Sequence, residues 1–166
     1  MHVNSVKAYK LNLQTIMIAD DDNDDQLLLS QAISEIAPHI QLMPVKDGNE
    51  LLSQLQVSKP DLLFLDLQMP CKSGMECLEN IRSNEGHAQM PVVVFSSSSR
   101  PANVEAAYNA GADLFFTKPT SYRELVENVK VILYLNWADP AAIQAIKHSK
   151  PVFCAATGNT VNNPQS

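Results

Sequence analysis

Cysteine is scarce in this chain, which contains only three among its 166 residues, Cys71, Cys77 and Cys154. An odd number, with no CxxC pair and no histidine at zinc-ligand spacing, argues against a disulfide framework and against a structural zinc site. Long apolar runs are also absent, since no segment approaches the roughly 18 consecutive apolar residues of a membrane span. We therefore expect a soluble protein of the reducing cytoplasm that does not contact membranes.

Basic residues are outnumbered, with 12 Lys and Arg against 18 Asp and Glu, for a formal net charge of -6. Such a surface repels a phosphate backbone, so direct nucleic-acid binding is disfavoured. The length and the 45% hydrophobic content suffice for one ordinary domain. We expect that domain over residues 14–137, with an N-terminal extension, 1–13, and a C-terminal tail, 138–166, that holds at most a short helix before becoming disordered.

Short apolar runs of strand length alternate with longer segments of helical period, which predicts an α/β fold built around a parallel sheet. The strands are expected at residues 16–19, 40–45, 62–65, 92–95 and 114–116. Pro44 cannot donate a hydrogen bond to a neighbouring strand, so the second strand is expected at a sheet edge. The third strand is apolar on both faces, which is typical of a central strand covered by helices on each side.

Two helices carry clear signals. The first begins near Asn23 and ends at Pro38, and we expect it to bury one face made of Leu28, Leu29, Ala32, Ile33 and Ile36. The last begins with a capping box at Ser121 and Glu124. Its inward face is expected to consist of Tyr122, Leu125, Val126, Val129, Ile132 and Leu133.

Polar residues follow the predicted strands directly. Asp20, Asp21 and Asp22 follow the first strand, Asp66 the third, Ser96 the fourth and Lys118 the fifth. Carboxyl ends of parallel strands meet at one sheet edge, where converging carboxylates need a cation, and oxygen ligands favour magnesium. We interpret Asp22 as a helix cap only.

Asp66 is the central acid of this group and the best candidate for a nucleophile that accepts a phosphoryl group. Lys118 and Ser96 flank it and offer an ammonium and a hydroxyl to the phosphoryl oxygens.

Four motifs stand in order along the chain: IADDD at 18–22, LDLQMPCKSG at 65–74, VVVFSSSS at 92–99 and FFTKP at 115–119. Together they resemble the motifs of bacterial two-component receiver domains, and the resemblance extends from about Thr15 to Trp137. It implies a single-domain, CheY-like response regulator: a doubly wound, flavodoxin-like five-stranded sheet of order 2-1-3-4-5 with helices on both faces.

The resemblance also implies roles for individual residues. Asp66 would be the phosphoacceptor, and Asp21, Asp66 and the backbone carbonyl of Gln68 would bind magnesium directly, with Asp20 helping through water. Ser96 and Lys118 would contact the phosphoryl group, and Ser96 and Phe115 would form the switch. A cis peptide bond is implied between Lys118 and Pro119.

As a partner, the resemblance implies a histidine kinase or a phosphotransfer protein that supplies the phosphoryl group. The domain would then act as a phosphoacceptor with self-catalysed transfer and autodephosphorylation, not as a turnover enzyme. Its output would be a changed surface of the fourth helix, fifth strand and last helix, recognised by an unidentified downstream protein.

Three rival functions are disfavoured. A haloacid dehalogenase-type phosphatase needs a second Asp two residues after the nucleophile, where this chain has Gln68. A flavodoxin-like carrier needs a phosphate cradle after the first strand, where three aspartates would repel phosphate. A DNA-binding output module does not fit in the 29 residues after Trp137, which contain two lysines, Lys147 and Lys150.

The last helix has more apolar residues than its inward face needs, namely Val131, Tyr134, Leu135 and Trp137. We expect a homodimer through this helix to cover them. The alternative is the tail, because Asp139 and Pro140 are typical of a helix start and Ala142, Ile143 and Ile146 could then fold back over the surplus.

Overall fold

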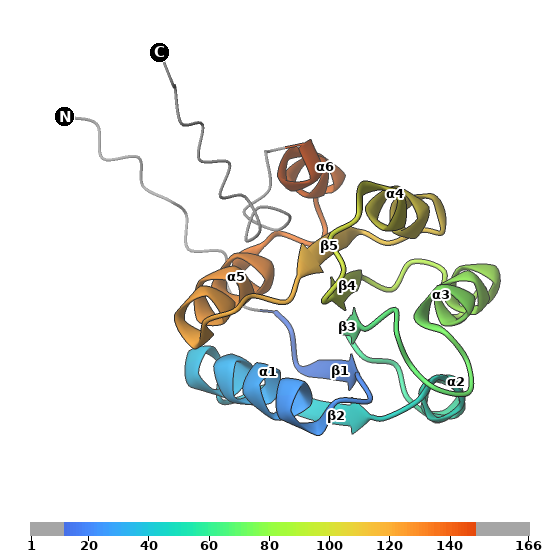
Figure 1. Ribbon diagram of the computed structural model, residues 1–166, viewed down its shortest axis with the longest axis horizontal. Helices are drawn as coiled ribbons and strands as arrows, with labels where there is room; N and C mark the ends of the chain where they lie inside the picture. The colour runs from blue at the N-terminus through green and yellow to red at the C-terminus, as the bar shows by residue number, and fades with distance from the viewer. Residues whose placement is uncertain (1–11, 149–166) are drawn as a thin grey trace, which may run out of the picture.

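The computed structural model describes residues 12–148 and is shown in Figure 1. In chain order the elements are β1 (Thr15–Ala19), α1 (Asn23–Ile36), β2 (Gln41–Val45), α2 (Gly48–Val57), β3 (Leu62–Leu65), α3 (Gly74–Ser83), β4 (Val92–Ser96), α4 (Pro101–Asn109), β5 (Leu114–Thr117), α5 (Tyr122–Tyr134) and α6 (Pro140–His148). The alternation of strands and helices is the one that the apolar periodicity predicts. Most of the expected extension and tail, 1–11 and 149–166, lies outside the described residues.

The five strands form one parallel sheet in the order β2-β1-β3-β4-β5, which confirms the predicted fold class. Helices α1 and α5 cover one face, and α2, α3 and α4 cover the other (Figure 1). β3 is buried along its whole length, as expected of a central strand. Among the described residues, no helix is long and apolar enough to cross a membrane.

Alternate side chains of the strands point into two hydrophobic cores, one on each face of the sheet. Phe64, Phe95 and Phe116 pack on the α1 and α5 side, whereas Phe115 packs on the side of α2, α3 and α4. Gly111 adopts a positive φ of 107° just after the C-cap residue of α4, a backbone conformation that glycine adopts without strain at the end of a helix.

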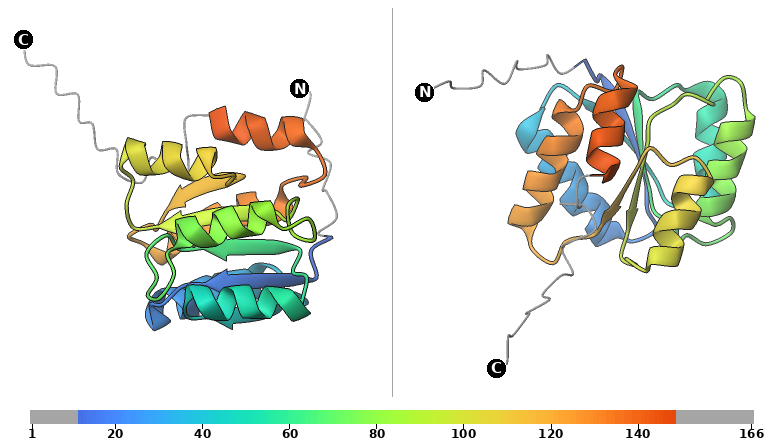
Figure 2. Two further views of the ribbon diagram at one scale, coloured as in Figure 1. Left: turned by 90° about the vertical axis from the view of Figure 1, so that its right-hand side faces the viewer. Right: turned by 90° about the horizontal axis from the view of Figure 1, so that it is seen from above.

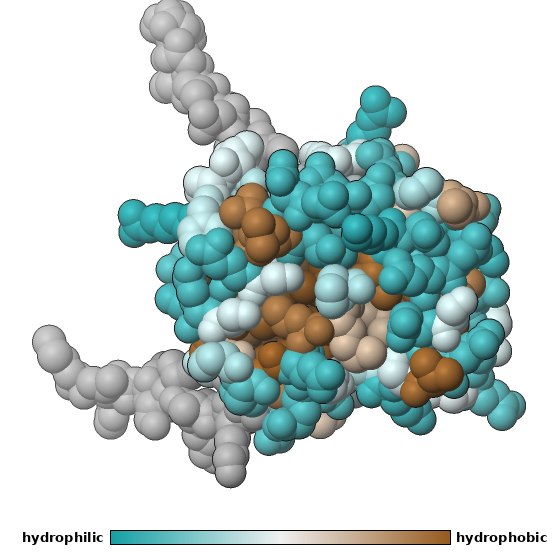
Figure 3. All heavy atoms as spheres, turned by 90° about the horizontal axis from the view of Figure 1, so that it is seen from below, coloured by the Kyte–Doolittle hydropathy of each residue, from teal (hydrophilic) through white to brown (hydrophobic). Residues whose placement is uncertain are grey.

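The two edge strands of the sheet are protected against pairing with other strands in different ways. β2 is an edge strand, as predicted, and its Pro44 lies exposed beside Ile18 of β1. Figure 3 shows the side of the molecule with α1, β2 and α2, where an apolar patch lies among polar side chains. β5 is the opposite edge strand, and α6 lies over it (Figures 1 and 2).

The prediction that Leu28 faces the core is wrong, because its side chain is 42% exposed. The buried face of α1 consists of Gln26, Leu29, Ala32 and Ile33. The Gln26 side-chain amide donates to the carbonyl oxygen of Val45 at 3.0 Å, which anchors the first turns of α1 to the end of β2. With about 3.6 residues per turn, Leu28 lies roughly 200° around the helix from Gln26 and therefore faces solvent.

α6 begins at Pro140, where the sequence indicated a helix start. Its Ile143 and Ile146 pack against the α1 and α5 side of the core together with Leu135 and Trp137. The tail thus covers part of the apolar surplus, as in the second of the two alternatives. Val131 and Tyr134 remain 36% and 47% exposed, and the homodimer stays a prediction.

Candidate functional site

The strand register brings the polar residues of the carboxyl edge together. Ala19 lies beside Leu65, and the residues that follow them, Asp20 and Asp66, are therefore neighbours. Ser96 is the last residue of β4 and pairs with Thr117 of β5, and Lys118 directly follows Thr117. Asp20, Asp66 and Ser96 are all buried, at 2%, 5% and 1% exposure. Buried polar groups at the carboxyl ends of parallel strands mark this edge as the candidate site.

Asp20, Asp21 and Asp66 form an acidic cluster in which one carboxylate oxygen from each residue lies within 4.8 Å of the others. Asp20 and Asp66 are buried and Asp21 is exposed, so the cluster is open to solvent on one side. Asp22 takes no part in the cluster and caps α1 by accepting hydrogen bonds from the backbone of Asp24 and Asp25, as expected. The cluster supplies the oxygen-only donor set that a hard divalent cation requires.

Asp20 shows that the cluster is electrostatically unfavourable by itself. Burial raises the pKa of the Asp20 carboxyl from 3.8 to about 6, even though Lys118 and the backbone N–H of Asp22 lower it. The charge of Asp66 raises it further. A divalent cation would relieve this penalty by favouring the ionised carboxylates, so the residues present fit a metal site.

Lys118 places its ammonium among these acids. Its Nζ lies 2.8 Å from Asp20 Oδ2, 2.8 Å from Asp25 Oδ2 and 3.1 Å from Asp66 Oδ2. Burial alone would lower the pKa of the ammonium, but hydrogen bonds to Asp20 and Asp25 and the charge of Asp66 raise it above its ordinary value. The side chain is therefore a permanent positive charge at the site.

The peptide bond between Lys118 and Pro119 is trans, as are all peptide bonds of the described residues, so the cis bond implied by the resemblance is not present. Lys118 reaches the acids without it. Its backbone N–H donates to the carbonyl oxygen of Ser96 at 2.8 Å, and its Nζ lies 5.3 Å from the centre of the Phe95 ring. These contacts and the three ion pairs aim the ammonium at the cluster.

Asp66 is held from two sides. One carboxylate oxygen accepts from the backbone N–H of Gln68 at 3.1 Å, and the other faces Lys118. The loop that follows returns to the end of β3, where the Gly74 N–H donates to the Leu67 carbonyl oxygen at 3.1 Å. A Cβ atom at Gly74 would collide with the Asp66 carbonyl oxygen, so only glycine permits this close approach.

The two expected switch residues lie on neighbouring strands, Ser96 at the end of β4 and Phe115 within β5. The Ser96 hydroxyl is buried and accepts from the backbone N–H of Ser98 at 3.3 Å. Phe115 is buried on the side of the sheet covered by α2, α3 and α4, and its backbone N–H donates to the Tyr108 hydroxyl at 3.0 Å. The structure thus gathers Asp20, Asp21, Asp66 and Lys118, with Ser96 on the neighbouring strand.

Sequence reasoning missed Asp25. It lies in the first turn of α1, where a carboxylate is readily explained by the helix dipole. Its contact with Lys118 joins residues 93 positions apart, and no local pattern reveals such a pair.

Comparison with known proteins gives a consistent result. The response regulator receiver domain family matches residues 16–130. The cyclic di-GMP phosphodiesterase response regulator RpfG of Xanthomonas campestris pv. campestris (strain 8004) is 30% identical over 120 residues. These residues make up 72% of this chain and 32% of that protein, so the chain spans about a third of its curated relative.

Solved structures show the same similarity. The phosphorylated cyanobacterial phytochrome response regulator RcpA is 29% identical with a TM-score of 0.70, and the match covers 76% of this chain and 97% of that one. The Mn²⁺-bound form of response regulator Rcp1 is 27% identical with a TM-score of 0.67, covering 72% and 91%. The chemotaxis response regulator CheY4 of Vibrio cholerae, 18% identical with a TM-score of 0.64 over 72% and 98%, shares the fold.

Proposed function

The chain belongs to the response regulator receiver domain family, and on that premise we propose that Asp66 is the residue that accepts the phosphoryl group. The observation that carries the proposal is the position of Asp66. Asp66 follows the central strand β3, between Asp20 at the end of β1 and Ser96 at the end of β4, and its carboxylate lies 3.1 Å from the Lys118 ammonium. Receiver domains generally take phosphoryl groups from histidine kinases, and a histidine kinase or a phosphotransfer protein is the proposed donor here.

The proposed metal is Mg²⁺, held by Asp20, Asp21, Asp66 and the backbone carbonyl of Gln68. The acidic cluster and the similarity to a Mn²⁺-bound receiver are consistent with a divalent cation. Such an ion would act as a Lewis acid that offsets the negative charge of the carboxylates and the phosphoryl oxygens. Replacing the exposed Asp21 with Ala is expected to abolish Mg²⁺ binding without unfolding the domain, and unchanged affinity would refute its assignment as a ligand.

The side chains then perform the transfer. A carboxylate oxygen of Asp66 forms a bond to phosphorus, the bond from phosphorus to the donor's imidazole nitrogen breaks, and its electron pair stays on the imidazole. Lys118, already 3.1 Å from Asp66, donates a hydrogen bond to a phosphoryl oxygen, and the Ser96 hydroxyl donates to another. Both transfer and the later hydrolysis by water are self-catalysed.

The output in this proposal is a changed surface of α4, β5 and α5. Reorientation of Ser96 toward the phosphoryl group opens space into which Phe115 moves, and a downstream protein recognises the altered surface. The receiver unit is taken as residues 14–137. A cytoplasmic location is part of the proposal, because Cys71 and Cys77 are both free.

Acetyl phosphate and beryllofluoride test the assignment directly. We expect Asp66 to be modified when Mg²⁺ is present and not in EDTA, with mass spectrometry of peptides locating the phosphoryl group. Asp66→Asn should abolish the modification. Asp24→Asn serves as the matched control, because Asp24 is an exposed acid in the first turn of α1 and is not part of the acidic cluster. Equal phosphorylation of the Asp66→Asn protein would refute the proposal.

A further inference from the structure

α6 occupies the face on which the proposed output depends. It lies over the edge strand β5, in the space between α4 and α5 (Figures 1 and 2). The apolar side chains Ile143 and Ile146, spaced three residues apart, pack against the core, whereas Gln144 and Ala145 face solvent. α6 is therefore an amphipathic helix seated on the α4-β5-α5 surface.

A short series of contacts joins α6 to the interior of the domain. Lys147 Nζ lies 4.9 Å from the centre of the Tyr108 ring, which belongs to α4. The Tyr108 hydroxyl in turn accepts the hydrogen bond from the backbone N–H of Phe115 in β5. A shift of the β5 backbone at Phe115 would therefore change the position of the Tyr108 hydroxyl and hence the surface that Lys147 contacts.

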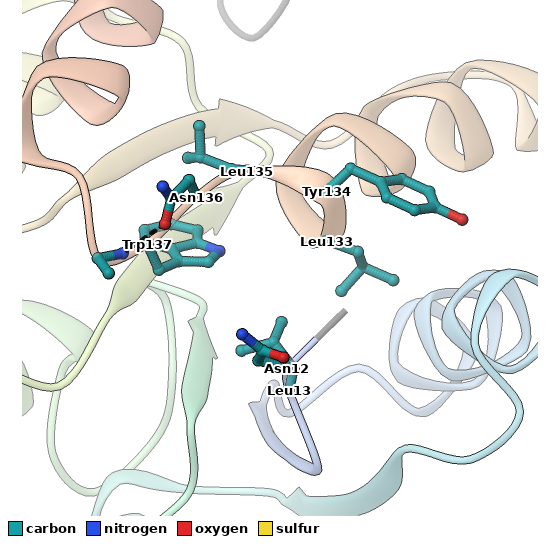
Figure 4. A pocket seen from close by; sticks show the side chains of 8 residues that line it. Asn12, Leu13, Leu133, Tyr134, Leu135, Asn136 and Trp137 are labelled. Carbon is teal, nitrogen blue, oxygen red and sulfur yellow. Dashed lines mark hydrogen bonds between the residues drawn. The ribbon is translucent and has the colours of Figure 1, made fainter. Parts of the chain in front are cut away.

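Side chains do not completely fill the space between α6 and the rest of the domain. A hollow of about 260 Å³ lies along α6, between Pro140, Ile143 and Lys147 and the ends of the loops at Pro91 and Asp113. A separate hollow of about 270 Å³ lies at the linker between α5 and α6, where Leu133, Leu135 and Trp137 line it, and it is not lined by α6 itself (Figure 4). A helix of nine residues is not stable alone, so α6 depends on this imperfect contact for its structure.

We infer that α6 is a built-in occupant of the α4-β5-α5 surface, and that modification of Asp66 loosens it so that a partner's amphipathic helix can take its place. The partner helix would present the same pattern, two apolar side chains three residues apart followed by a cation. This inference rests on the proposed function. Beyond that function, it states that α6 covers the α4-β5-α5 surface as long as Asp66 is unmodified.

Hydrogen–deuterium exchange of the full chain tests the inference. With Mg²⁺ and beryllofluoride, amide exchange in 140–148 should accelerate at least about fivefold, within the usual range of coupling between two sites. Trp137 is the only tryptophan of the chain, and its emission should shift to the red as α6 leaves. Loading of Asp66 is followed independently by ¹⁹F NMR of the bound beryllofluoride.

Coupling must also run in the opposite direction. Ile143→Asp, which detaches α6, should tighten beryllofluoride binding by a similar factor, because affinity effects between two sites are reciprocal. Lys147→Ala removes the contact with the Tyr108 ring but keeps Ile143 and Ile146, and it should give a smaller change of the same sign. Ala145→Asp puts the same charge on the exposed face of α6 and should change neither exchange nor affinity.

The outcomes separate the two proposals. If Asp66 loads and exchange in α6 stays unchanged, the inference is wrong and the proposed function stands. Equal beryllofluoride affinity in the Ile143→Asp, Lys147→Ala and Ala145→Asp proteins would also overturn the inference. If beryllofluoride does not load at all, the proposed function fails, and the inference fails with it.

Discussion

Replacing Asp20 with Asn should stabilise the domain when no metal is bound. Burial raises the pKa of Asp20 from 3.8 to about 6, so keeping this carboxylate ionised in the folded protein at pH 7.5 costs about 3 kcal/mol relative to the unfolded chain. The attraction of Lys118 is already included in that pKa, and Lys118 keeps Asp25 and Asp66 as partners. The expected gain in the free energy of unfolding is about 2–3 kcal/mol.

The pH dependence of this gain identifies its origin. The folded protein binds the Asp20 proton more tightly than the unfolded chain does, so the contribution of Asp20 to the stability of the wild type falls as pH rises from about 4 to about 6. The Asn side chain does not titrate. The difference between the two proteins should therefore be full above pH 6 and should disappear toward pH 4.

Urea denaturation in EDTA at several pH values measures this difference, and Asp21→Asn is the control at an exposed position of the same cluster. A stability difference that does not change between pH 4.5 and pH 7.5, or a loss of stability in Asp20→Asn at pH 7.5, would refute the electrostatic reasoning.

Three further predictions concern the same region. The affinity for Mg²⁺ should fall below pH 6 by up to about tenfold per pH unit, because protons then compete with the metal for Asp20. Calorimetric titration at several pH values measures this affinity, and an affinity that does not change with pH would contradict the prediction. Gly74→Ala should destabilise by more than about 2 kcal/mol in urea denaturation, since the new Cβ would meet Asp66 and lie 2.6 Å from Leu67 Cα. Leu28→Ala should change stability by less than about 0.5 kcal/mol, whereas the same change at the buried Leu29 should cost about 2–5 kcal/mol, and equal losses would contradict the observed rotation of α1.

The sheet could be predicted from sequence because its signals are local. The apolar segment before Asp66 is long enough for one strand and has no polar face, which allows only a central position in the sheet. Pro44 placed its strand at an edge for an equally local reason. The rotation of α1 could not be predicted in this way. It depends on a hydrogen bond from Gln26 to Val45, and apolar periodicity assigns such a polar residue to the surface.

The candidate site likewise combines residues that local signals predict with residues that only long-range contacts reveal. Asp20, Asp66 and Lys118 could be predicted because each follows a strand directly, and parallel strands end at one edge. Asp25 could not, because its role depends on where the first turn of α1 lies relative to Lys118. The local sequence also could not decide between a homodimer and a folded-back tail, because either of them would cover the apolar side chain of Trp137.

The two edges of the sheet have different protection against pairing with strands of other chains. Pro44 is part of the covalent structure and disrupts strand addition at β2 under all conditions. At β5 the protection is a docked helix, together with the Tyr108 hydroxyl that already occupies the backbone N–H of Phe115. Whenever α6 leaves, β5 becomes the open edge, and aggregation should begin there. A long-lived activated state would therefore carry a solubility cost that a short phosphoryl lifetime avoids.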